Sequence, residues 1–124
     1  MRSTAIRLLV GFAVAFLAGR EVVASVPSVE ECYEAADFIA NAARARDNGI
    51  ERDAFVDRLR EDFQLIRAFP PELRWFVKDE DDEAFLQDAS ESVFARPRTP
   101  DRQEAEFLVS CLERRGVMLG WGST

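Results

Sequence analysis

The sequence predicts an all-α fold, a small bundle of four to five helices whose first and last helices are joined by a disulfide. Apolar residues recur at spacings of three and four from residue 29 onward, which is the period of an amphipathic helix. No segment of useful length shows the apolar–polar alternation of a strand. The two cysteines, Cys32 and Cys111, each fall on the apolar stripe of a predicted helix.

The first predicted helix covers residues 29–48. Ser28 and Glu31 have the spacing of a capping box, in which each side chain accepts a hydrogen bond from the backbone of the other residue. The helix ends at Asn48, because Gly49 can take the left-handed conformation that follows many last turns. Its inward stripe consists of Val29, Cys32, Ala36, Ile39 and Ala43, widened by Tyr33 and Ala35.

The second predicted helix follows at once, with Glu51 as its N-cap and with Ile50 and Phe55 at the spacing of a hydrophobic staple. Pro70 and Pro71 end it. Because the connection is only about two residues long, the first two helices are expected to be antiparallel. The inward face consists of Phe55, Leu59, Phe63 and Ile66, flanked by Val56 and Phe69.

A third, short helix is predicted from Pro71, because proline suits the first helical position. The acidic run that follows favours the start of a fourth helix, since carboxylates stabilise a helix N-terminus. The sequence leaves open whether these two helices are continuous. The third carries Leu73, Trp75, Phe76 and Val77, and the fourth points Phe85, Leu86, Ala89 and Val93 inward.

The last predicted helix begins with Thr99 as N-cap and Pro100 at the first helical position, and Gly116 ends it. Its inward residues are Leu108, Cys111 and Leu112, with Phe107 beside them. Residues 116–124 are apolar but broken by glycines, and we expect a tail that is flexible or docks loosely.

Residues 1–24 are predicted to be a signal peptide. Arg2 and Arg7 precede an uninterrupted apolar stretch at residues 8–18, which is too short to cross a bilayer. Small or modest side chains at residues 22–24 favour cleavage after Ala24. The protein is therefore expected in the bacterial periplasm or outside the cell, with an uncleaved anchor or a buried helix as the alternatives for this stretch.

Residues 25–124 are expected to form a single acidic helical domain. Loss of Arg2, Arg7, Arg20 and Glu21 with the signal peptide reduces 16 basic and 23 acidic residues to 13 and 22, a net charge of −9. Such a surface repels nucleic-acid phosphates and anionic lipid headgroups. We therefore expect no nucleic acid and, after cleavage, no membrane among the partners.

A pair of cysteines in a small exported domain predicts a disulfide, here between Cys32 and Cys111. A bridge across 79 residues restricts the unfolded chain by roughly 4–5 kcal/mol in the loop-entropy model, as an upper estimate. A reactive thiol pair is the alternative, and it lacks both the close spacing and the basic neighbours that such a pair needs.

The motifs of catalysis are missing from the sequence. The chain contains no histidine, which removes the usual general base and the commonest metal ligand, and it contains no phosphate-binding loop. The acidic run fails the EF-hand pattern, since Ala84 stands where glycine is required and Ser90 where the closing glutamate is required. We therefore expect no enzyme, metal or cofactor.

Trp75 and the acidic run after it are the predicted partner-binding residues. On a helix, Trp75 stands about 200° from Leu73, off the apolar stripe, and partly exposed aromatic residues are typical of binding hot spots. The carboxylates would steer a basic partner. A second-layer contact of Trp75 with the core is the alternative. The proposed set is Trp75, Asp79, Glu80, Asp81, Asp82 and Glu83.

Three functions are compatible with these features. The first is an exported, non-enzymatic protein that binds another protein, as an inhibitor, an immunity factor or an accessory subunit. The second is an acid-stress chaperone, because a small exported helical protein with one long-range disulfide is similar in general plan to the periplasmic acid-stress chaperones. No stretch of sequence carries a motif of that family, and the two cysteines lie farther apart than in those proteins. The third is a small hydrolase of envelope polymers.

Overall fold

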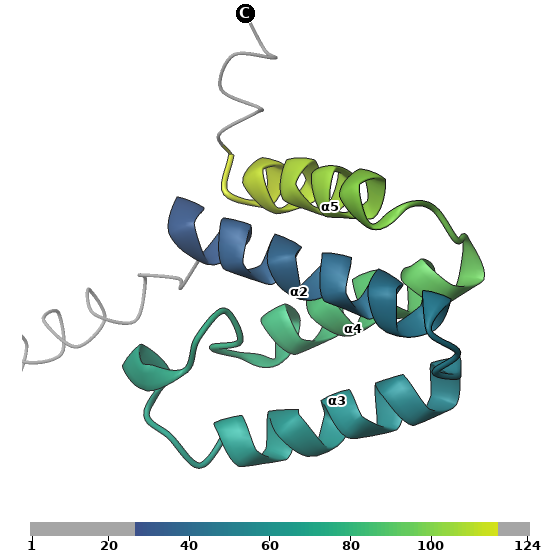
Figure 1. Cartoon of the computed structure of the whole chain (residues 1–124). Helices are drawn as coiled ribbons and strands as arrows, with labels where there is room; N and C mark the ends of the chain where they lie inside the picture. The colour runs from purple at the N-terminus through teal and green to yellow at the C-terminus, as the bar shows by residue number, and fades with distance from the viewer. Residues whose placement is uncertain (1–26, 117–124) are drawn as a thin grey trace, which may run out of the picture.

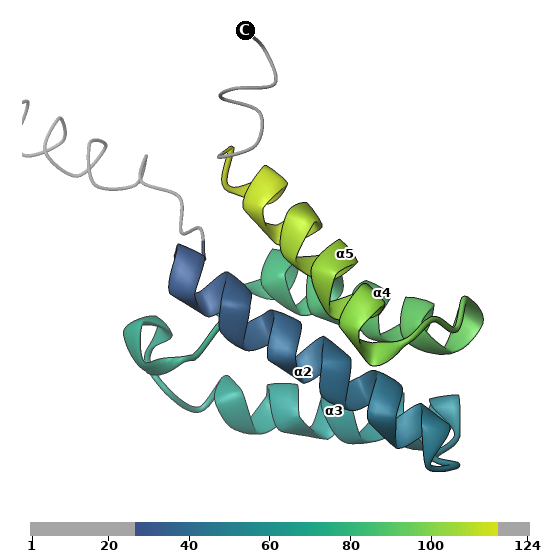
Figure 2. The ribbon, with the colours of Figure 1, turned by 45° about the horizontal axis from the view of Figure 1, so that its top comes forward.

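The computed structural model describes residues 27–116, which form four α-helices and one 3-10 turn (Figure 1). The helices are α2 (Val29–Asp47), α3 (Arg52–Ile66), α4 (Glu80–Ala95) and α5 (Pro100–Arg114), and the 3-10 turn is η1 (Pro71–Leu73). Successive helices run in opposite directions, and α3 and α5 lie on opposite sides of α2 (Figures 1 and 2). The predicted all-α bundle is confirmed. The predicted signal peptide and most of the predicted tail lie outside the described residues.

Helix α2 is the central element of the bundle. Its N-terminus has the predicted capping box, with Ser28 Oγ accepting from the Glu31 amide at 3.0 Å and Glu31 Oε1 accepting from the Ser28 amide at 2.9 Å. After the helix, Gly49 has the expected positive φ of 96°. Small side chains let α4 and α5 approach α2 closely. Its buried residues are Cys32, Ala35, Ala36, Ile39, Ala40, Ala42 and Ala43.

The predicted disulfide is confirmed. Cys32 in the first turns of α2 and Cys111 near the end of α5 are bonded, with their Cα atoms 5.8 Å apart. Both cysteines are fully buried within the core. The bridge therefore joins the first and last helices at the end of the bundle where α2 begins.

Helix α3 starts after Glu51 as predicted, although the Glu51 side chain makes no capping hydrogen bond. Its buried residues are Val56, Leu59 and Phe63, with Phe55 and Ile66 packed at the edge of the core. The helix ends at Ile66, earlier than the prolines suggested. Phe69 consequently lies in a loop and is exposed, rather than flanking the inward face of the helix.

The predicted third helix is wrong beyond its first turn. Only Pro71–Leu73 is helical, as a single 3-10 turn, and an irregular segment follows up to Asp79, so η1 and α4 are separate. Arg74 explains the loop, because its guanidinium donates to three backbone carbonyls, those of Phe69 at 2.7 Å, Lys78 at 3.0 Å and Arg67 at 3.1 Å. These contacts, with partners four to seven residues away in sequence, hold the segment in its irregular conformation.

Helices α4 and α5 begin where the sequence predicts. Asp79 accepts from the Asp82 amide at 2.9 Å, and Thr99 accepts from the Arg102 amide at 3.3 Å. The core between them is aromatic, with the rings of Phe85 and Phe107 5.4 Å apart. On α5 the buried residues are Phe107, Cys111 and Gln103, whereas Leu108 and Leu112, predicted to point inward, are half-buried.

No helix within residues 27–116 combines the length and the apolar character needed to cross a membrane.

Candidate functional site

Trp75 lies in the irregular segment between η1 and α4. Its ring is 6.0 Å from the ring of Phe38 on α2 and 6.0 Å from that of its neighbour Phe76, which is fully buried. One side of Trp75 thus packs on the core, as the alternative interpretation expected, while the side chain stays partly accessible. The sequence places Trp75 off the apolar stripe of a predicted helix. That argument does not apply, because the segment that contains Trp75 is not helical.

The accessible side of Trp75 borders an apolar groove. The groove has a volume of about 310 Å³ and lies between α3, Phe38 of α2 and Trp75. We call it the Trp75 groove; its lining residues are Phe38, Leu59, Asp62, Phe63, Leu65, Ile66 and Trp75.

Three large apolar side chains around the end of α3 are unusually exposed. Leu65 is 67% exposed, Phe69 is 55% exposed and Leu73 is 68% exposed. Leu65 also lines the Trp75 groove. We call these three residues the apolar rim. They fall within nine residues of sequence, before and after the two prolines. The sequence predicts Phe69 and Leu73 on helices, which the structure does not form at these positions.

Lys78 fixes the position of the Trp75 segment. Its Nζ donates to Glu31 Oε2 at 2.7 Å and to the carbonyls of Trp75 at 2.7 Å and Arg74 at 3.0 Å. Burial by itself raises the pKa of Glu31, but the hydrogen bonds from Lys78 and Ser28 and the charge of Lys78 outweigh it, so the pKa of Glu31 is lowered. Sequence reasoning gave Lys78 no role, although it is the only lysine in the chain.

Asp82 belongs to the interior and not to an acidic surface, which corrects its place among the predicted partner-binding residues. It is only 1% exposed. Its Oδ2 accepts from the Lys78 amide at 3.0 Å, and its Oδ1 pairs with Arg114 Nη1 at 2.9 Å. The guanidinium of Arg114 also lies 4.6 Å from the centre of the Phe85 ring. The ion pair therefore ties the start of α4 to the end of α5.

Glu83 is also engaged within the protein. Its two carboxylate oxygens accept from Nε and Nη2 of Arg67, with the Nε–Oε2 distance at 2.8 Å. These hydrogen bonds, with the charges of Glu83 and Glu80, raise the pKa of Arg67. The pair joins the end of α3 to α4. Of the predicted acidic set, Asp79 caps α4, and Glu80 and Asp81 are exposed.

A second groove lies between α4 and α5. It has a volume of about 310 Å³, an apolar floor that includes Ile39, Phe85 and Phe107, and a polar edge that includes Asp88, Ser92 and Ser110. Its edge carries charges of both signs, from Arg96 and Glu106 as well as Asp88.

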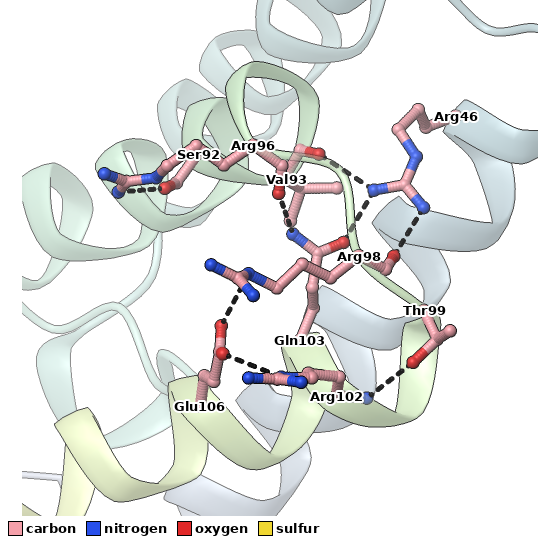
Figure 3. A network of polar contacts seen from close by, with 9 residues as sticks. All are labelled: Arg46, Ser92, Val93, Arg96, Arg98, Thr99, Arg102, Gln103 and Glu106. Atoms are coloured by element: carbon pink, nitrogen blue, oxygen red, sulfur yellow. Dashed lines mark hydrogen bonds and ion pairs between the residues drawn. The ribbon is translucent and has the colours of Figure 1, made fainter.

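Two lining residues of this second groove, Arg96 and Gln103, belong to a polar network around Arg46 (Figure 3). Arg46 donates to the carbonyl of Val93 at 2.9 Å, to Gln103 Oε1 at 2.6 Å and to the carbonyl of Arg98 at 2.7 Å. Gln103 in turn donates to the carbonyl of Arg96 at 3.2 Å. The network supplies hydrogen-bond donors to backbone carbonyls at the end of α4 and in the loop after it. It also explains why the polar side chain of Gln103 is buried.

The carboxylates of α2 and α5 approach one another on the outer face of the bundle. A hydrogen bond with Asp37, together with burial and the charges of Asp37 and Asp101, raises the pKa of Glu104.

Among the residues that the structure describes, no three His, Cys, Asp or Glu side chains are placed to hold a metal ion.

Comparison of the chain with models of protein families, with curated proteins and with solved structures found no match.

Proposed function

We propose that the protein is an exported, non-enzymatic interaction protein that binds another protein through the Trp75 groove and the apolar rim. The observation that carries the proposal is a mostly apolar groove whose lining includes the exposed Leu65, together with two more exposed apolar side chains, Phe69 and Leu73, within eight residues of it in sequence. Clustered apolar exposure on an otherwise charged surface is typical of protein–protein interfaces. Other exposed large apolar side chains among the described residues are Val29 and Tyr33 on α2, Ile50 before α3, and Val109 on α5.

The contacts of Trp75 support this assignment. A hot-spot residue contributes more to binding affinity when its side chain is already held in place, because less side-chain freedom is lost on binding. The carbonyl of Trp75 accepts from Lys78, and its ring packs on Phe38 and Phe76. Trp75 is thus a rigid aromatic anchor in the lining of the groove.

The exposed acids Glu80 and Asp81 are proposed to raise the association rate with a basic partner. Both lie in the first turn of α4, which begins directly after the Trp75 segment. Such steering charges act through the on-rate and are screened by salt.

An acid-stress chaperone is the second candidate, and one observation favours it. The Trp75 segment is held by two carboxylates, Glu31 and Asp82, through Lys78. Protonation of Glu31 at low pH would remove its charge from the contact with Lys78 and so loosen the Trp75 segment. The test is an aggregation assay with a client protein below about pH 3. Suppression of aggregation at a molar ratio of less than one molecule of this protein per client would favour this candidate over the first.

The experiment for the first candidate is capture from a periplasmic extract at neutral pH. The full chain is expressed, exported and immobilised, and the captured proteins are compared between wild type, Leu65→Glu and Val109→Glu. Val109→Glu is the matched control, because it places the same charge at an exposed apolar position on α5. A partner that is lost with Leu65→Glu and kept with Val109→Glu supports the proposal. A partner kept by both variants contradicts it.

A further inference from the structure

We propose that the groove between α4 and α5 binds a short apolar peptide by its free ends, with the α-amino group at Asp88 and the α-carboxylate at Arg96. This second site goes beyond the proposed function, because no residue lines both this groove and the Trp75 groove. Two unpaired charges of opposite sign, and the length of groove between them, select such a ligand.

Helices α4 and α5 form the two walls of this groove, and Ile39 of α2 lies in its floor. On each wall the lining residues recur at spacings of three and four, so they follow one face of each helix. Small-ligand sites often lie between the helices of a bundle, and about 310 Å³ is at the lower end of their usual volume. The wall residues are Phe85, Asp88, Ala89, Ser92, Val93 and Arg96 on α4, and Gln103, Glu106, Phe107 and Ser110 on α5.

The apolar part of the lining suits small side chains. Val93 and Phe107 are buried in the core, while Phe85 and Ala89 are half-buried and supply the accessible apolar surface. The polar part of the lining includes serine hydroxyls, which can donate to and accept from the peptide groups of a ligand. A peptide with side chains the size of alanine fits this lining better than one with large side chains.

The lining carries three charged side chains, of which two are available to a ligand. Glu106 pairs with Arg102 at 3.3 Å and with Arg98 at 3.7 Å (Figure 3). Within residues 27–116, Asp88 pairs with no cation and Arg96 pairs with no carboxylate, and both side chains are exposed. The groove therefore offers one anion and one cation, which together complement a zwitterion.

The guanidinium of Arg96 is held beside the groove. Its Nη2 donates to Ser92 Oγ at 2.8 Å, and Ser92 is itself a lining residue (Figure 3). A carboxylate that binds Arg96 therefore lies at the groove, where it can also accept a hydrogen bond from the Ser92 hydroxyl.

The distance between the two charges selects the length of the peptide. Asp88 and Arg96 are eight residues apart on one face of α4, which is about 12 Å at the α-helical rise. An extended chain covers at most about 3.5 Å per residue, so three residues span about 10 Å and four span about 14 Å. The two ends of a tripeptide or a tetrapeptide therefore reach both side chains, whereas those of a dipeptide do not.

The test follows backbone amide signals by NMR while the full chain, isotope-labelled and purified after export, is titrated with trialanine. We expect saturable shifts within residues 88–96 and 103–110 and none at the Trp75 groove. N-acetyl-trialanine lacks the cation, and trialanine amide lacks the anion. Each of these blocked peptides, and dialanine, should bind at least about threefold more weakly than trialanine, and the differences between free and blocked peptides should shrink as salt rises.

Matched variants assign each end of the peptide to one side chain. Asp88→Asn should bind trialanine and its acetylated form equally, and Arg96→Gln should bind trialanine and its amide equally. Both replaced side chains are exposed, so the fold should be unaffected. Glu113→Gln on α5 and Arg58→Gln on α3 change charges outside the groove and should keep both differences.

Other results would overturn the proposal. The absence of saturable shifts with every peptide at millimolar concentration would show that the groove is no peptide site. Shifts confined to the Trp75 groove would place the binding elsewhere. Equal affinity of wild type for free and blocked trialanine would overturn recognition of the two ends and would favour an internal segment of a protein partner as the occupant.

Discussion

Lys78 Nζ lies 2.7 Å from Glu31 Oε2, and this ion pair fastens the segment that carries Trp75 to the first turn of α2. Both side chains are largely buried, so solvent screens the pair less than the ion pairs on the surface. The same ammonium also donates to the backbone carbonyls of Arg74 and Trp75. The aromatic side of the candidate site is thus positioned by one cation.

The lowered pKa of Glu31 predicts a pH dependence of stability. Because the folded state lowers this pKa below its usual value of 4.5, the contribution of Glu31 is complete above that value and is lost as pH falls through the lowered one. Glu31→Gln should therefore reduce the free energy of unfolding at pH 7 by about 1–2 kcal/mol. The difference from wild type should shrink below pH 4.5.

Urea denaturation of both proteins from pH 7 to pH 3 measures this difference. The matched control is Glu30→Gln, the exposed neighbour in the same first turn. A difference between Glu31→Gln and wild type that stays constant over the whole range would contradict the assignment.

Asp82→Ala should be among the most destabilising single changes in this protein. It leaves the guanidinium of Arg114 without its carboxylate and removes the acceptor of the Lys78 amide. Loss of one partner of a buried pair costs about 3–5 kcal/mol, and the partial exposure of Arg114 places this case near 3 kcal/mol. Asp81→Ala, at the exposed neighbour, should change stability by less than about 0.5 kcal/mol. Equal effects of the two changes in thermal unfolding would show that Asp82 has no special role.

The contrast between Ser28 and Asp82 shows how much of the structure the sequence could predict. The caps at Ser28 and Thr99 involve residues three apart, so their spacing alone predicts the start of α2 and α5. Asp82 meets Arg114 across 32 residues, and no local pattern predicts that contact. From the sequence alone the acidic run therefore resembles one uniform surface, although Asp82 within it is internal.

Trp75 shows the same limit. The sequence identified it as a candidate anchor, but on a helix that does not form, because Arg74 binds carbonyls on both sides of the segment. The groove depends on Phe38 and Leu65, which come from two different helices. Only the packed structure brings them together with Trp75.

Reduction of the Cys32–Cys111 bridge should destabilise the protein by as much as about 4–5 kcal/mol, since the bridge closes a loop of 79 residues. The double variant Cys32→Ala and Cys111→Ala should behave like the reduced protein. Urea midpoints with and without reductant measure the effect. A midpoint that reductant leaves unchanged, with both thiols shown to be free, would mean that the bridge contributes little to stability.

Processing of the N-terminus tests the predicted export. Expressed with residues 1–24 in a bacterium, the protein should accumulate outside the cytoplasm with Ser25 as its first residue, within about two positions. Intact-mass analysis of the exported fraction gives the answer. A mass that retains Met1 in that fraction would contradict the signal peptide.

The most direct test of the proposed binding surface is the affinity of the double variant Leu65→Ala and Leu73→Ala for the partner captured by wild type, measured by calorimetry. Both side chains are mostly exposed, so the melting temperature should stay within about 2 °C of wild type while affinity falls at least about tenfold. Val109→Ala is the control and should leave affinity unchanged. Wild-type affinity in the double variant would contradict the account, because the partner would then bind elsewhere.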